Sequence, residues 1–382
     1  MSKRKVRHLK KSRPSKSGLR SFVLMIGLML SLTVAGGIWA QWRSLRSSTR
    51  PTLRSSTGQP QDQPEFPQGS TEASASPTPL RKEYVYANGR LVATDTPALP
   101  ELTDIGIWRP STGTWWIFNS ANGTYFAQLW GMNGDQPVQA DYDADGKTDF
   151  AVWRPSNGNW YFLKSSDGAN IFGPQWGVGT DHPVPGNYGA DEKTDYAVWR
   201  PSNGTWYVLT NSASSVMITQ QWGASTDQPV PGDYDGDGRT DFAVFRPNDN
   251  GAGNSAWHIL RSSDGERMDV QWGSYGTNGT NADQPLPGDY DGDGRTDIAV
   301  FRPTNGTWHI RRSSDGSYLY QQWGYGTDEP VPGDYDGDGK CDVAVRRANT
   351  TWYIRKSSSG LMMVAQWGMA GDLVVPGAYN RW

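Results

Sequence analysis

The sequence of 382 residues contains a single cysteine, Cys341. No disulfide can therefore form within the chain, and no zinc cluster can be built from cysteines. Acidic residues are missing from residues 1–54, which hold 13 of the 36 Lys and Arg residues. The rest of the chain carries the other 23 basic residues against 39 acidic ones, a net charge of −16. This acidic body argues against nucleic acid as a partner, because phosphate groups need a basic surface.

Glycine, proline and aromatic residues, by contrast, are abundant. The chain has 45 Gly, 25 Pro, 19 Trp and 17 Tyr, without a collagen period. Its hydrophobic content of 36% is enough for a core, which excludes a chain that is disordered throughout. This composition predicts short aromatic strands joined by tight turns.

One apolar run, residues 21–40, has twenty residues without a charge, the length of a helix that crosses a hydrocarbon layer of about 30 Å. Nine Lys or Arg precede it. We therefore expect a basic cytoplasmic tail at residues 1–20 and a transmembrane signal anchor at residues 21–42, in a single-pass membrane protein with its C-terminal body outside the cytoplasm. The alternative is a signal peptide cleaved near Ala35, which would give a secreted or periplasmic protein.

The next segment, residues 43–82, consists mostly of Ser, Thr, Pro, Gln and Gly, the composition of a disordered linker. Residues 83–100 then form a hairpin extension. Apolar and polar residues alternate there about Asn88-Gly89, a pair that favours a type I′ turn.

A repeat fills residues 101–382. Trp-Gly pairs mark six copies, 44 to 51 residues apart, at Trp130, Trp176, Trp222, Trp272, Trp323 and Trp367. Each full copy predicts four short antiparallel strands, and repeats of this length with four strands are typical of the all-β propeller. The sequence therefore predicts a β-propeller rather than an open stack of sheets.

The two ends of the repeat region complete one another. The first copy lacks its opening strand and begins at Leu102, whereas the chain ends with an opening strand at residues 375–382. We expect six blades, with blade one closed by pairing of N- and C-terminal strands, which covers the edges that an open array would expose. A seventh blade recruited from residues 81–100 is the alternative.

Four of the copies carry an acidic loop between their first and second strands. Carboxylates at positions 1, 3, 5 and 9 and a backbone carbonyl at position 7 supply hard oxygen ligands, and glycine at position 6 permits the sharp turn. We expect about four structural Ca²⁺ sites. The ligands are Asp141, Asp143, Asp145, Lys147 and Asp149; Asp233, Asp235, Asp237, Arg239 and Asp241; Asp289, Asp291, Asp293, Arg295 and Asp297; and Asp334, Asp336, Asp338, Lys340 and Asp342.

An EF-hand loop begins in the same way, but it needs Glu at position 12 and flanking helices. Here position 12 is valine inside a β-rich run, as at Val152 and Val244. DxDxDGxxD loops followed by a hydrophobic strand resemble the FG-GAP, or VCBS, repeat of integrin alpha-subunit heads and bacterial exported proteins. The resemblance covers about three quarters of the chain. It implies a calcium-stabilised propeller for adhesion or recognition, with structural metal loops away from the ligand face.

The loop of blade three departs from this pattern. It has Asn187 at position 1, Gly189 at position 3 and Glu192 where glycine is needed. A left-handed conformation costs a non-glycine residue about 1–2 kcal/mol. We predict an empty or weak site there, and we interpret Cys341, which replaces a threonine at position 8, as a tolerated side chain.

Fifteen of the 19 tryptophans occupy three repeat positions, which favours packing between blades over stacking on sugars. Repeated arginines such as Arg200 and aspartates such as Asp181 are interpreted as structural pairs. His258 and His309 occupy a position that other copies fill with tyrosine, so neither is a convincing catalytic base.

Blade four differs from the other copies by two insertions, of about five residues within 248–255 and about six within 274–282. Alternating strand direction puts both on the face opposite the acidic loops. Insertions on one face of a repeat protein often mark its binding surface. The predicted ligand rim consists of Asn248, Asp249, Asn250, Asn254, Tyr275, Asn278 and Asn281.

These observations favour a membrane-tethered recognition or adhesion module whose ligand is an extracellular protein or a glycan. No Ser or Cys nucleophile stands in a recognisable setting, and the acidic residues are assigned to metal loops, so we do not expect an enzyme. The alternatives are a structural envelope component without a dedicated ligand and a polysaccharide-acting enzyme.

Overall fold

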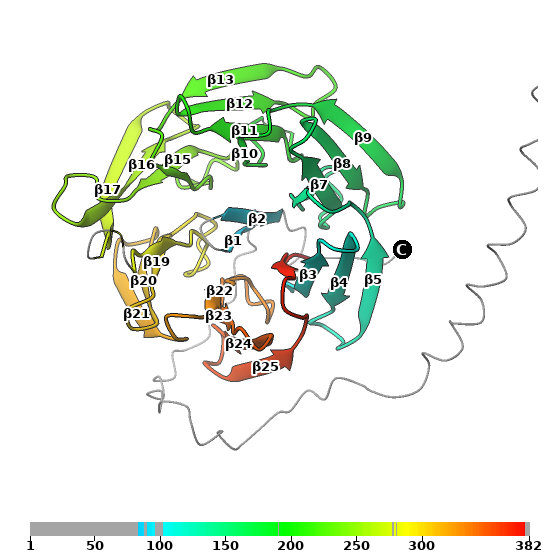
Figure 1. Ribbon diagram of the computed structural model, residues 1–382. Coiled ribbons are helices and arrows are strands. Elements are labelled where there is room, and N and C mark those ends of the chain that lie inside the picture. The colour runs from blue at the N-terminus through cyan, green and yellow to red at the C-terminus, as the bar shows by residue number, and fades with distance from the viewer. Residues whose placement is uncertain are drawn as a thin grey trace, which may run out of the picture. The chain divides into compact units, whose positions relative to one another are not determined.

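The computed structural model describes residues 83–87, 90–95, 102–189, 191–276, 279 and 281–378 (Figure 1). The predicted cytoplasmic tail, membrane segment and linker lie outside these residues. Within the described part of the chain, no helix has the length and apolarity to cross a membrane. β1 (Glu83–Ala87) and β2 (Arg90–Asp95) pair with each other as an antiparallel hairpin, as the Asn-Gly pattern predicts.

Six four-stranded antiparallel sheets are arranged as the blades of a propeller (Figure 1). Blade one contains β26 (Leu373–Val374), β3 (Ile105–Arg109), β4 (Thr114–Phe118) and β5 (Tyr125–Leu129). Blade two contains β6 (Gln136–Pro137), β7 (Phe150–Arg154), β8 (Asn159–Leu163) and β9 (Asn170–Gln175). Blade three contains β10 (His182–Pro183), β11 (Tyr196–Arg200), β12 (Thr205–Leu209) and β13 (Met217–Gln221).

The other three blades follow the same order. Blade four contains β14 (Gln228–Pro229), β15 (Phe242–Arg246), β16 (Asn254–Leu260) and β17 (Arg267–Ser274). Blade five contains β18 (Gln284–Pro285), β19 (Ile298–Arg302), β20 (Thr307–Arg311) and β21 (Tyr318–Gln322). Blade six contains β22 (Glu329–Pro330), β23 (Val343–Arg346), β24 (Thr351–Arg355) and β25 (Met362–Gln366).

Each strand's place in its blade follows from its side chains. The second strand of a blade is a continuous apolar run and is buried on both faces; in β19 only Arg302 is partly exposed. The fourth strand lies at the outer edge and alternates exposed and half-buried residues, as β21 does. Because the sheets pack face to face, each core cluster joins two neighbouring blades, as Trp160 of blade two does with Tyr196 of blade three.

The Trp-Gly tryptophans connect the blades in a closed series. Each indole N–H donates a hydrogen bond to a backbone carbonyl in the third strand of the next blade. The pairs are Trp130 to Tyr161, Trp176 to Tyr207, Trp222 to His258, Trp272 to His309, Trp323 to Tyr353, and Trp367 to Trp116. The last pair joins blade six to blade one, so the ring closes at six blades. The predicted packing role of these tryptophans is confirmed.

A second closed series runs through the loops between the first and second strands. The backbone N–H at position 8 of each loop, or its equivalent in blade one, donates to the carbonyl at position 1 of the preceding blade. The pairs are Thr103 to Asp334, Thr148 to Ala378, Thr194 to Asp141, Thr240 to Asn187, Thr296 to Asp233, and Cys341 to Asp289. Cys341 is buried at a position that the other blades fill with threonine, which agrees with its interpretation as a structural side chain.

Blade one is closed by both ends of the chain, but the closing strand is not where the sequence placed it. β26 is Leu373–Val374 and pairs with β3, two residues before the predicted start at Val375. The strand precedes the Val-Pro-Gly segment, just as β6 does in blade two. Gly106 permits the close return of the chain, since a Cβ there would lie 2.2 Å from the Val375 carbonyl oxygen. The alternative of a seventh blade is excluded by the closed ring.

Six arginine–aspartate pairs hold the end of the second strand to the loop that enters each blade. Arg200 Nε lies 2.7 Å from Asp181 Oδ1, and its Nη2 lies 2.8 Å from the other oxygen. The remaining pairs are Arg109–Asp372, Arg154–Asp135, Arg246–Asp227, Arg302–Asp283 and Arg347–Asp328. The predicted pairing is confirmed, and its two-point geometry fixes the aspartate side chain.

Candidate metal centres

The acidic loops lie at one end of the propeller, between the first and second strands of their blades. In blade two the loop starts after Ala140 and ends at Asp149, where an isolated bridge between these two residues closes its base. The same bridge recurs in every blade, including Asp104 with Gly377 in blade one. These bridges therefore place position 9 next to position 1 in every blade, independently of the residues in the loop between them.

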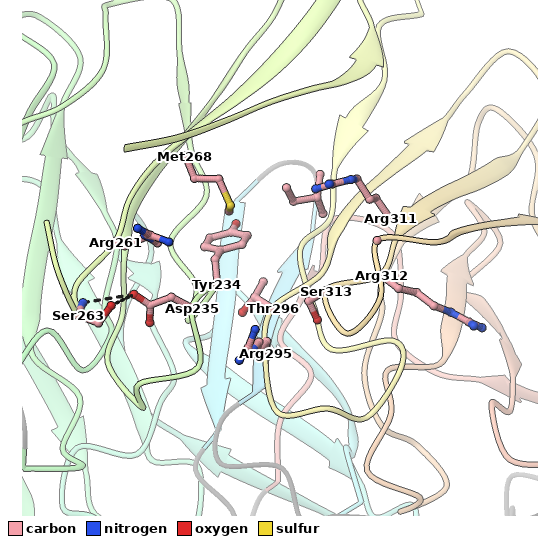
Figure 2. A pocket seen from close by; sticks show the side chains of 12 residues that line it. Tyr234, Asp235, Arg261, Ser263, Met268, Arg295, Thr296, Arg311, Arg312 and Ser313 are labelled. Carbon is pink, nitrogen blue, oxygen red and sulfur yellow. Dashed lines mark hydrogen bonds between the residues drawn. The ribbon is translucent and has the colours of Figure 1, made fainter. Parts of the chain in front are cut away.

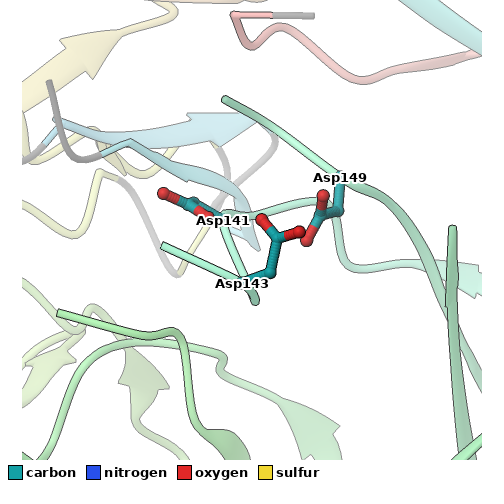
Figure 3. A group of neighbouring side chains, drawn as sticks. All are labelled: Asp141, Asp143 and Asp149. Carbon is teal, nitrogen blue, oxygen red and sulfur yellow. The ribbon is translucent and has the colours of Figure 1, made fainter. Parts of the chain in front are cut away.

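Four loops bring the carboxylates at positions 1, 3 and 9 together. Within each group one oxygen from every residue lies within 4.8 Å of the others. Figure 3 shows the group in blade two, where Asp143 and Asp149 face each other with Asp141 beside them. The groups are Asp141, Asp143 and Asp149; Asp233, Asp235 and Asp241; Asp289, Asp291 and Asp297; and Asp334, Asp336 and Asp342.

Backbone N–H groups fix the first and last carboxylates. Asp141 accepts hydrogen bonds from the N–H groups of Ala144 and Gly146 at 2.7 and 2.9 Å. Asp149 accepts from Tyr142 N at 2.9 Å and Ser165 N at 2.6 Å. These contacts orient both side chains without a cation, so the site is largely preformed.

The turn between the third and fourth strands supports the loop from below. In blade two, Ser165 Oγ donates to Asp145 at 2.8 Å and Ser166 Oγ to Asp143 at 2.5 Å. A basic residue followed by two serines occurs in this turn in blades two, four, five and six, the four blades that carry an intact acidic loop. Sequence reasoning missed these serines, although their restriction to the same four blades was a usable signal.

Positions 5 and 7 have different surroundings from the triad. Asp145 and its counterparts Asp237, Asp293 and Asp338 accept a hydrogen bond from the first serine of the supporting turn. The side chain of Arg239, at position 7, binds Asp237 Oδ2 at 2.6 Å. The structure thus groups three of the four predicted carboxylates. Ligation by position 5 and by the position 7 carbonyl stays a prediction.

Burial and mutual repulsion make these carboxylates hard to ionise in the absence of a cation. Burial, together with the smaller effect of the charge of Asp143, raises the pKa of Asp149 to about 8 against the opposing hydrogen bond from Ser165 N. In blade six, burial and the charge of Asp336 raise the pKa of Asp342 to about 8. Burial also raises the pKa of Asp141 and of Asp334 to about 6.

The donor set fits a hard divalent cation. Asp143 Oδ1 and Asp336 Oδ1 are buried and have no hydrogen-bond partner among the described residues, so an oxygen in each of these two sites is left for an ion. Carboxylate oxygens without sulfur or imidazole are the ligands that Ca²⁺ prefers. A bound Ca²⁺ would supply positive charge to the triad and offset its repulsion.

The degenerate loop of blade three keeps part of the site. Glu192 has φ 63°, the left-handed conformation that was predicted to be unfavourable for it. Asn187 Oδ1 and Asp191 Oδ1 are buried without a hydrogen-bond partner among the described residues, and Asp195 accepts three backbone N–H groups. With two fewer carboxylates than the intact loops, weak binding there stays a prediction.

The two insertions of blade four lie at the opposite end from the acidic loops and contact each other. They lengthen the β16–β17 hairpin, and Tyr275 N donates to Gly253 O at 2.8 Å. Asp249, in the first insertion, contacts Arg246 and Gln271 and lies 3.1 Å from His258 Nε2. Asn248, Asn250, Asn254 and Asn281 are also placed at this end of the blade, whereas Asn278 lies outside the described residues.

A pocket of about 420 Å³ lies beside the second insertion. Gly279, Asn281 and Ala282 of the insertion line it together with Gln284 and Pro303 of blade five. One residue of the predicted rim, Asn281, therefore lines a concave surface, which the sequence alone did not indicate.

The fold and its loops define the class of protein: a six-bladed propeller with four acidic loop sites. Residues 233–300 and 289–345 match the FG-GAP-like repeat family. The chain thus carries FG-GAP-like repeats in a six-bladed β-propeller.

Solved structures match this chain at low sequence identity, and only the first of the three that follow has a TM-score above 0.5. TolB from Acinetobacter baumannii is 15% identical with a TM-score of 0.51, and the match covers 75% of this chain and 68% of TolB. A streptogramin B lyase is 10% identical with a TM-score of 0.42, covering 78% and 97%. BamB from Moraxella catarrhalis is 12% identical with a TM-score of 0.36, covering 75% and 100%. No curated protein matches the sequence.

Proposed function

We propose that this chain is a calcium-binding recognition module, held outside the cytoplasm by residues 21–42, whose ligand is an extracellular protein or a glycan. The observation that carries the proposal is the position of the two insertions of blade four. They are adjacent, they contact each other through Tyr275 and Gly253, and the second of them lines a pocket. Loops held by a rigid scaffold are where proteins commonly place binding residues.

The acidic loops have a supporting role in this proposal. They lie at the end opposite the insertions, and the backbone at position 1 of each loop accepts a hydrogen bond from the next blade. A cation bound there would hold adjacent blades in register and would stabilise the folded state by binding it alone. Calcium would therefore affect ligand binding through the integrity of the ring.

The test replaces both insertions with the shorter segments of blade five. Residues 248–256 are exchanged for Thr-Asn-Gly-Thr, as at residues 304–307, and residues 274–282 for Tyr-Gly-Thr, as at residues 325–327. The wild-type full-length chain and the grafted chain are each applied, in detergent and calcium, to a glycan array and to envelope extracts. We expect the graft to lose binding and to keep its calcium-dependent unfolding temperature.

The matched control is Asp336→Asn, which changes a metal loop and leaves the insertions intact. It should bind its ligand as the wild type does at saturating calcium. Unaltered binding by the graft would contradict the role of the insertions. A wild-type chain that binds nothing in either assay would favour a structural envelope component, and turnover of a polysaccharide would favour an enzyme.

A further inference from the structure

A second pocket, of about 490 Å³, lies between blades four and five at the end that holds the acidic loops. Blade four contributes its acidic loop, the turn after β16 and Met268 of β17, and blade five contributes its own loop and the end of β20. Four arginines line it: Arg261, Arg295, Arg311 and Arg312. Its volume lies within the range of pockets for small ligands.

Arg311 is a departure from the packing of the repeat. It ends the third strand of blade five, at a position filled by Phe118, Leu163, Leu209 and Leu260 in blades one to four. That position faces the preceding blade; Leu163 is 4% exposed and packs against tryptophans of blade one. A cation there loses the apolar contact, and Arg311, unlike Arg355 at the same position of blade six, lines the pocket.

Most of this positive charge is not neutralised within the described residues. Arg261 binds Asp264 at 2.6 Å, but Arg295, Arg311 and Arg312 form no ion pair in the described ranges. The Arg312 Nε atom is buried without a hydrogen-bond partner there. Asp235 is the one acid that lines the pocket, and it already accepts a hydrogen bond from Ser263 and belongs to the triad of blade four.

The arginines are arranged around a partly apolar floor. Figure 2 shows Arg311 extending from blade five toward Met268 and Tyr234, with Arg261 on the blade four side and Arg295 below. Arg312 points away from them in the same view. The planar guanidinium group presents several N–H donors in a fixed fork that matches the oxygens of a carboxylate, sulfate or phosphate.

We propose that this pocket binds an oxyanionic ligand, carrying carboxylate, sulfate or phosphate groups, with Arg295 and Arg311 as its main donors. The site is separate from the insertions of blade four and does not depend on them. It places four arginines around a pocket of a chain that carries a net charge of −16 after residue 54. Free anions and acidic saccharides are both sources of this chemistry.

The test measures binding by isothermal titration to the full-length chain in mild detergent with calcium. The probes are inorganic sulfate, inorganic phosphate, a trigalacturonate with its neutral galactose counterpart, and a sulfated disaccharide with its unsulfated form. The variants are Arg311→Leu and Arg295→Gln. The matched control is Arg355→Leu, which makes the same change at the same strand position of blade six, outside this pocket.

We expect at least one anionic probe to bind and the neutral saccharides not to bind. Arg311→Leu should weaken binding about tenfold or more, equivalent to about 1.4 kcal/mol, and Arg355→Leu less than twofold. Binding of the simple ions assigns the site to free anions, and binding of the acidic saccharides alone assigns it to glycans. Absence of binding by every probe, or an equal loss in the Arg355 control, would overturn the proposal.

Discussion

Replacing Asp336 with Asn should stabilise the metal-free protein and reduce the extra stability that calcium confers. Asp336 Oδ2 accepts a hydrogen bond from Ser358 Oγ, which Asn can keep, while its buried Oδ1 has no partner among the described residues. Its charge lies with those of Asp334 and Asp342, one oxygen of each within 4.8 Å. At that distance two like charges repel by about 3 kcal/mol with an effective dielectric constant of about 20.

The expected magnitude differs between the two conditions. In chelator at pH 8, Asp334 is ionised and Asp342 partly so, because burial and the charge of Asp336 raise the pKa of Asp342 to about 8. The substitution should therefore stabilise the metal-free protein by about 3 kcal/mol. In calcium it also removes a ligand, and a hundredfold loss of affinity would cost about 2.7 kcal/mol at saturation, which would cancel most of that gain.

The assay is thermal unfolding followed by circular dichroism at pH 8, in 1 mM calcium or 1 mM EDTA. The control is Asp315→Asn, an exposed acid of the blade five turn, which should behave alike in both buffers. We expect a shift of several degrees upward in EDTA and a much smaller shift in calcium for Asp336→Asn. A shift of the same size and sign in both buffers would refute a cation-binding role for this triad.

Three further outcomes follow from the same contacts. In EDTA the unfolding temperature should fall between pH 4 and pH 8, because the pKa of Asp297 rises from 3.8 to about 8 on folding. The folded state therefore holds this proton more tightly than the unfolded state, and that contribution to stability is lost as the pH rises. Saturating calcium should remove most of the fall. A chain ending at Val374 should unfold at a lower temperature, since it loses fully buried Val375 and the bond from Ala378 N to Thr148 Oγ1. Arg200→Ala should lower the free energy of unfolding by about 3 kcal/mol in urea denaturation and Arg200→Lys by less, because Asp181 would stay buried and unpaired.

Much of the fold could be predicted from the sequence because residues with a structural role recur at the same position in every copy of the repeat. A tryptophan that recurs before glycine must serve the same contact in every copy, and the structure shows that contact as the indole bond to the next blade. The register of the closing strand was misjudged because the Val-Pro-Gly landmark follows the strand instead of containing it. The position 8 ring could not be predicted, since it consists of backbone N–H and carbonyl groups and leaves no pattern in side chains.

The candidate metal centres were only partly predictable for a related reason. Aspartate spacing located four loops, but it could not show which carboxylates share a point. The first supporting serine donates to position 5, as Ser165 does to Asp145, the second donates to position 3, and positions 1, 3 and 9 form the triad. The arginine pocket forms between two neighbouring blades, so no local sequence pattern could predict it.

The departures from the repeat differ in what they preserve. Blade three has Asn187 and Gly189 in place of two metal ligands and lacks the supporting serine pair. These ligands and the serine pair that supports the loop are therefore lost together in this blade. Blades four and five keep their acidic triads, their Trp-Gly bonds and their arginine–aspartate pairs, yet they carry both insertions at one end and Arg311 at the other. Drift would be expected to weaken structural contacts along with the rest. Changes that leave the triads, the Trp-Gly bonds and the arginine–aspartate pairs in place are what selection for binding would produce, and both proposed sites lie at this junction.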